Sequence, residues 1–97
     1  MRAETSKALG LVLAERERQT AKWGNQDANH PHEWMTILGE EYGELCEAVY
    51  ETCKKSAHTR PERGGKARII EEAIQVAAVA VAIAEAMLSP EWDGKLE

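Results

Sequence analysis

The chain lacks positive charge over its middle third. No lysine or arginine occurs between Trp23 and Cys53, although this segment carries seven acidic residues. Four of the acids follow i, i+4, i+7 and i+11 spacing: Glu40, Glu44, Glu47 and Glu51. At about 100° per residue they fall within roughly 60° of one helix face, where each like-charge pair destabilises the helix by roughly 0.2–0.5 kcal/mol. The stripe indicates either a bound divalent cation or an acidic face in contact with water.

Other absences narrow the class of protein. Phenylalanine is missing, and the only two cysteines are Cys46 and Cys53. Seven residues apart on one helix, their Cα atoms would be about 10.5 Å apart, too far for a disulfide. We expect two reduced thiols facing the core, which fits a cytoplasmic location, as does the lack of a signal-peptide pattern in the charged first 20 residues. The net charge of −5 argues against general nucleic-acid or anionic-membrane binding.

The spacing of apolar residues predicts an all-α fold of three main helices in a single domain, residues 1–97. We expect the helices over residues 5–22, 32–55 and 66–88, with a loosely ordered tail at 89–97.

Two of these helices have an apolar face. In the first, Leu9, Val12 and Leu13 form an apolar patch. The apolar arc of the second contains Trp34, Leu38, Tyr42, Leu45, Val49 and Cys53. Glu41 lies beside this arc, so we expect it to be partly buried and to need a partner.

The third helix has almost no polar face. Between Ala73 and Leu88 only Gln75 and Glu85 are polar, and this stretch is too short and too polar to span a membrane. A helix that is apolar all round must be buried all round, and two other helices of a short chain cannot easily cover it. We therefore expect a homo-oligomer with this helix at the subunit interface.

A candidate metal centre involves the second and third helices. Glu72 and Gln75 are three residues apart and share a helix face. Facing Glu41 and Glu44, they would form a cluster of oxygen ligands between two helices, as in metal-binding helical bundles. Mg²⁺ prefers such ligands, and Mn²⁺ is an expected substitute.

A basic segment separates these two helices. From Lys54 to Arg68 there are six basic residues and one acid, with a loop at Pro61 and Gly64-Gly65. It is either a solvated linker or an electropositive lip for phosphates. The candidate phosphate-binding residues are Lys54, Arg63 and Lys66.

At this point the sequence resembles a known family. Glu40-Glu41-Tyr42-Gly43-Glu44-Leu45 resembles the E-E-x-x-E-L element of the MazG-like all-α nucleoside triphosphate pyrophosphohydrolases. Residues 72–75 match the position of that family's E-x-x-D element, and residues 15–26, with His30-Pro31, look like small phage-type members. The resemblance implies dimers or tetramers with four-helix-bundle cores. It also implies Mg²⁺-dependent hydrolysis of nucleoside triphosphates to a monophosphate and pyrophosphate.

The resemblance also assigns roles to residues. Carried over by position, Glu41, Glu44 and Glu72 would hold the metal, and Glu40 would orient or deprotonate the attacking water; Glu40 and Glu44 are the catalytic candidates. Gln75 stands where the family has Asp, so it would be a neutral fourth ligand. This departure keeps open a nucleotide-binding or sequestering protein with little or no turnover, and a bundle without any ligand is a third alternative.

Several residues before and at the start of the second helix have alternative roles. Trp23 either stacks on a base, whose edge Gln26 or Asn29 would read, or packs against the second helix. His30 and His32 have the H-x-H spacing of some zinc ligands, but the nearby acids suit Mg²⁺ better, so we favour loop and capping roles for both.

Overall fold

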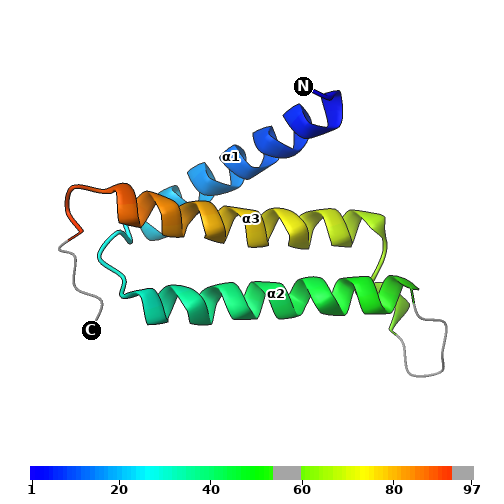
Figure 1. Ribbon diagram of the computed structural model, residues 1–97. Coiled ribbons are helices and arrows are strands. Elements are labelled where there is room, and N and C mark those ends of the chain that lie inside the picture. The colour runs from blue at the N-terminus through cyan, green and yellow to red at the C-terminus, as the bar shows by residue number, and fades with distance from the viewer. Residues whose placement is uncertain (54–59, 93–97) are drawn as a thin grey trace.

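The computed structural model of the chain describes residues 1–53 and 60–92. It contains, in order, α1 (Ala3–Trp23), α2 (Pro31–Cys53), the 3-10 turn η1 (Pro61–Arg63) and α3 (Lys66–Leu88). Neither described range contains a strand. The helices α2 and α3 lie antiparallel and side by side, while α1 crosses α3 at an angle and its N-terminal half projects away from the pair (Figure 1). The prediction of an all-α chain with three main helices is confirmed.

Local sequence explains where the helices begin and end. Gly24 adopts a φ of 72°, which favours glycine, and its N–H donates to the Thr20 carbonyl at 2.8 Å to end α1. Proline is suited to the first turn of a helix, and Pro31 begins α2. Gly65, with a φ of 104°, precedes α3, which ends before Ser89 and a proline.

The junction before α3 is tightly packed against the end of α2. A Cβ atom on Gly64 would lie 2.8 Å from the backbone carbon of Glu51 and 2.8 Å from the Thr52 hydroxyl oxygen. That hydroxyl donates to the Ala48 carbonyl at 2.6 Å and accepts from the Gly65 N–H at 2.6 Å. The beginning of α3 is thereby fixed against the last turn of α2, which sets how the acidic residues of the two helices face each other.

The core is small and lies between α2 and α3. Its buried cluster contains Trp34, Val79, Ala82 and Ala86, with Ile37, Leu38, Ile83 and Met87 packed against it. Trp34, the aromatic residue of this cluster, is only 4% exposed and is therefore a core residue.

Part of the predicted apolar arc of α2 is not buried by the chain. Cys46 and Cys53 are both exposed, so the prediction that they face the core is wrong. Tyr42 and Val49 are exposed as well. The arc is wider than the surface α3 can cover: at about 100° per residue, Tyr42 and the two cysteines lie about 80–120° from the buried Trp34.

The other helices also expose apolar side chains. Leu9 and Leu13 are exposed because the N-terminal half of α1 projects from the helix pair (Figure 1). The single chain buries one side of α3, including Ala78 and Val79, and leaves Ile70, Val81 and Leu88 exposed. Within the described ranges, no helix has the length and apolar character needed to cross a membrane.

Candidate metal centre and adjoining pocket

Three carboxylates from two helices converge beside the core. Glu41 and Glu44 of α2 and Glu72 of α3 each offer an oxygen, and these oxygens lie within 4.8 Å of one another. Glu72 is buried, Glu41 is half-buried and Glu44 is exposed. The sequence analysis predicted that these three acids would face one another between the two helices together with Gln75, and the predicted partial burial of Glu41 is confirmed.

The cluster is electrostatically unfavourable without a cation. Burial, followed by the charges of Glu44 and other nearby acids, raises the pKa of Glu41. Burial also raises the pKa of Glu72, as do the adjacent Glu44 carboxyl group and the neighbouring carboxylate charges, while Arg68 acts in the opposite direction. The buried Oε2 of Glu72 has no hydrogen-bond partner among the described residues. A buried anionic oxygen without a partner is costly, so the donor set fits a hard divalent cation.

Arg68, which the sequence analysis did not select, contacts this cluster. Its Nη1 lies 2.9 Å from Oε1 of Glu72 and 3.8 Å from Oε1 of Glu71. The Arg68 side chain is 41% exposed, whereas that of Glu72 is 3% exposed. The i, i+4 spacing of Arg68 and Glu72 on α3 was the signal that could have identified the pair.

An open cleft adjoins the cluster on the side of the α2–α3 connection. It has a volume of about 460 Å³ and is lined by Glu44, Glu47, Glu62, Arg63 and Arg68. Arg63, a predicted phosphate-binding residue, forms an ion pair with Glu47 at 3.3 Å. Lys66 is exposed at the first residue of α3 and is not among the lining residues, and Lys54 lies outside the described residues.

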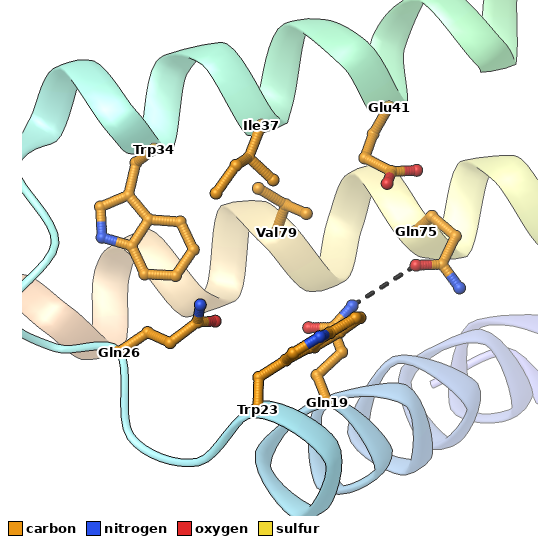
Figure 2. A pocket seen from close by; sticks show the side chains of 8 residues that line it. All are labelled: Gln19, Trp23, Gln26, Trp34, Ile37, Glu41, Gln75 and Val79. Carbon is orange, nitrogen blue, oxygen red and sulfur yellow. Dashed lines mark hydrogen bonds between the residues drawn. The ribbon is translucent and has the colours of Figure 1, made fainter.

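A second pocket adjoins the cluster toward the core (Figure 2). It has a volume of about 250 Å³ and is lined by Gln19, Trp23, Gln26, Trp34, Ile37, Glu41, Gln75 and Val79. Trp23 is 51% exposed, and the Lys22 ammonium nitrogen lies 4.7 Å from the centre of the Trp23 ring. The predicted base-binding candidates Trp23 and Gln26 therefore share one pocket with a member of the acidic cluster.

Gln75 faces α1 in this structure. Its Oε1 accepts a hydrogen bond from Gln19 Nε2 at 3.4 Å, as Figure 2 shows. Gln19 is 7% exposed, donates to Glu15 Oε2 at 3.0 Å and accepts from Arg16 Nη1 at 2.7 Å. Sequence reasoning gave no role to Gln19 or Glu15, because nothing in their spacing indicates which helix they meet.

Glu15 is the charged member of this polar network. Its hydrogen bond to Arg18, together with weaker contributions from the amides of Gln75 and Gln19, lowers the pKa of Glu15 to about 2. Arg16 of the same helix forms an ion pair with Glu85 of α3 at 2.8 Å. The Arg16–Glu85 and Gln19–Gln75 contacts hold α1 against α3, and Gln19 and Gln75 also line the second pocket.

The remaining candidates lie at the edges of the site. Glu40 is exposed and is not one of the three converging carboxylates, although its charge contributes to the raised pKa of Glu41. His30 Nδ1 accepts from the backbone N–H of His32 at 3.1 Å, and their rings stack at 5.0 Å. This geometry is a cap at the beginning of α2, as favoured for these histidines.

Comparisons with known protein families, with curated proteins and with solved structures found no match for this chain.

Proposed function

We propose that the chain is a divalent-cation-dependent nucleoside triphosphate pyrophosphohydrolase. In this reaction water is added across the α,β-phosphoanhydride bond, which yields a nucleoside monophosphate and pyrophosphate. The observation that supports the proposal most strongly is the convergence of Glu41, Glu44 and Glu72 within 4.8 Å, between an aromatic pocket and a cleft that contains two arginines. The choice of bond rests on the resemblance of residues 40–45 to the E-E-x-x-E-L element.

The two cavities suit the two ends of such a substrate. Aromatic rings and a side-chain amide are suited to a base, and the pocket containing Trp23 and Gln26 supplies both. Guanidinium groups are suited to phosphates, and Arg63 and Arg68 line the cleft. Lys66, at the start of α3, adds positive charge near that end.

The carboxylates have distinct roles in the proposal. Glu41, Glu44 and Glu72 hold Mg²⁺ or Mn²⁺, which supplies charge neutralisation for the phosphates. Glu40, exposed and next to Glu41, is the candidate to orient or deprotonate the attacking water. We place Gln75 at the edge of the metal site as a neutral ligand or a neighbour, since its carbonyl oxygen accepts from Gln19.

One observation favours a second candidate function. The side chain at position 75 is an amide engaged with α1, so the cluster has three carboxylates in place of four. A protein that binds the cation–nucleotide complex with little or no turnover would have the same pocket, cleft and cluster.

We also propose that the chain acts as a homodimer or homotetramer with a four-helix-bundle core. The exposed apolar residues of α2 and α3, including Tyr42, Val49 and Val81, support this proposal, because burying such side chains between subunits is favourable. Light scattering at micromolar concentration should give at least a dimer, and a stable monomer would contradict the proposal.

The test of function is a panel of canonical and modified ribo- and deoxyribonucleoside triphosphates, incubated with Mg²⁺, Mn²⁺ or chelator and assayed for monophosphate and pyrophosphate. Glu44→Gln should abolish release. Glu33→Gln is the matched control, because Glu33 is an exposed acid of the same helix that lies outside the three-carboxylate cluster and lines neither the cleft nor the aromatic pocket. Nucleotide-induced thermal stabilisation without turnover would identify the binding protein. The absence of both turnover and stabilisation would refute both candidates.

A further inference from the structure

We propose that Arg68 links the two sites, so that phosphate binding in the cleft and divalent-cation binding at the three carboxylates strengthen each other. This inference rests on the proposed function for the cation and the substrate class, and it goes further by assigning a role to Arg68. The ligand recognised by the cleft is the terminal phosphate group of the nucleotide, or the pyrophosphate that the reaction releases.

Arg68 contacts both sites. Its Nη1 lies 2.9 Å from Oε1 of the buried Glu72, one of the three converging carboxylates. The same side chain is 41% exposed and lines the cleft with Glu44 and Arg63. A guanidinium has five N–H donors in a planar fork. The ion pairs that Arg68 makes with Glu71 and Glu72 are both recorded at Nη1, and the planar fork carries further N–H groups that can donate to an anion in the cleft.

Glu72 is the residue through which the effect passes. Its Oε1 faces Arg68, while its buried Oε2 has no partner in the described part of the chain. One carboxylate can therefore contact Arg68 through one oxygen and a cation through the other. When a cation shares the negative charge of Glu72, the positive charge of Arg68 is less neutralised and attracts an anion more strongly.

The charges of the cleft make this dependence strong. Three acids line it, Glu44, Glu47 and Glu62, against two arginines, and the cluster adds Glu41 and Glu72 beside it. Without a cation, these carboxylates outnumber the guanidinium groups, so a polyphosphate should bind poorly. By thermodynamic linkage, any gain that the cation gives to the anion must equal the gain that the anion gives to the cation.

The experiment measures cation affinity by calorimetry with and without inorganic pyrophosphate, and pyrophosphate affinity with and without Mg²⁺. The wild-type chain should bind each partner about tenfold or more tightly in the presence of the other, within the 5–150-fold range typical of linked sites. Arg68→Gln should lose most of this enhancement. It should bind Mg²⁺ alone at least as tightly as the wild type, because the competing positive charge at Glu72 is gone.

Arg63→Gln is the matched control, because it removes the same charge from the same cleft but Arg63 pairs with Glu47 and not with the cluster. It should lower pyrophosphate affinity and keep the enhancement. A cation that merely bridges protein and pyrophosphate would give equal enhancement in the wild type and Arg68→Gln, which would overturn the proposal, as would an equal loss in Arg63→Gln. Weaker binding of Mg²⁺ alone in Arg68→Gln would reduce Arg68 to a structural residue.

Arg68→Lys, which keeps the charge without the planar fork, should keep part of the enhancement and shows whether loss in Arg68→Gln reflects misfolding. These binding measurements need no turnover. Enhancement without nucleotide hydrolysis would refute the proposed enzyme and keep the link through Arg68. Nucleotide hydrolysis together with an enhancement that is unchanged in Arg68→Gln would keep the proposed enzyme and refute the link through Arg68.

Discussion

Replacing Glu41 by glutamine should stabilise the cation-free protein and remove most of the stability that a divalent cation adds. Burial and three neighbouring acids all raise the pKa of Glu41. A carboxyl group whose folded pKa exceeds its unfolded pKa lowers folding stability at neutral pH, where the unfolded chain ionises it more readily. Glutamine has nearly the same shape and no charge, so it removes this cost and also removes an anionic ligand.

The distance within the cluster sets the magnitude. Two unit charges at the 4.8 Å limit that encloses the three oxygens repel by about 1 kcal/mol in water and about 3.5 kcal/mol at an effective dielectric constant of 20. Glu41 is half-buried, and Arg68 offsets part of the charge of Glu72. We therefore expect a gain of about 1–2 kcal/mol, and each kcal/mol raises the Tm of a chain this short by about 4–8 °C.

The assay is thermal unfolding followed by circular dichroism at fixed protein concentration, in chelator and in excess MgCl₂. The wild type should start lower and rise on adding Mg²⁺, while Glu41→Gln should start higher and rise little. Glu47→Gln, which loses only an exposed ion pair with Arg63, should change by less than about 1 kcal/mol and keep the Mg²⁺ response. The reasoning fails if Glu41→Gln is less stable than the wild type in chelator, or if Mg²⁺ stabilises both equally.

Four further predictions follow from the same geometry. In chelator, the free energy of unfolding should fall as pH rises from about 4.5 through the raised pKa values of Glu41 and Glu72, because the folded state keeps protons that the unfolded state releases; urea titrations in chelator across this range that show no decline would contradict it. Glu15→Gln should destabilise the chain by about 1–3 kcal/mol at pH 7, because lowering the pKa from 4.5 to about 2 corresponds to about 1.4 kcal/mol per unit, reduced here because the partner Arg18 is half exposed. The stabilisation by Glu15 is complete above pH 4.5 and is lost as pH falls toward 2. An unchanged urea midpoint for the variant at pH 7 would refute this prediction. Gly64→Ala should cost about 1–3 kcal/mol through overpacking, whereas Gly10→Ala, whose Cβ would meet nothing within 4 Å, should stabilise by about 0.5–1 kcal/mol; equal chemical-denaturation midpoints for the two variants would argue against the tight junction. Gln75→Asp should lower the cation-free Tm by placing a charge near Glu15 and should tighten Mg²⁺ binding, while Gln75→Ala should weaken it; if calorimetry finds Mg²⁺ affinity unchanged in both, Gln75 lies outside the metal shell.

Much of the fold could be predicted, because the spacing of apolar residues and the positions of glycine and proline along the chain indicate where helices lie and end. The bounds of α3 agree with the prediction, and Gly24 and Pro31 mark the loop between α1 and α2. The grouping of Glu41, Glu44 and Glu72 was also predictable, since residues three or four apart share a helix face and helical bundles build metal sites from side chains on facing helices.

Spacing identifies an apolar face but not the surface that covers it. Cys46, Cys53 and Leu13 belong to apolar faces that the chain itself does not bury. The N-terminal half of α1 projects from the α2–α3 pair, so the three helices have more apolar surface than they can bury against one another. Arg68 was missed for a different reason: six basic residues fall in one segment, and the i, i+4 spacing that pairs Arg68 with Glu72 was not used to choose among them.

At position 75 an amide, unlike a carboxylate, can connect the polar network of α1 to the acidic cluster between α2 and α3. A carboxylate there could only accept hydrogen bonds and would add charge beside Glu15, whereas an amide accepts from Gln19 and its N–H groups remain donors. The amide therefore joins α3 to the polar network of α1 three residues after Glu72. The Gln19–Gln75 contact thus joins two lining residues of the aromatic pocket to the helical turn that carries the buried Glu72, so in the proposed function the base site and the cation site share one structural element.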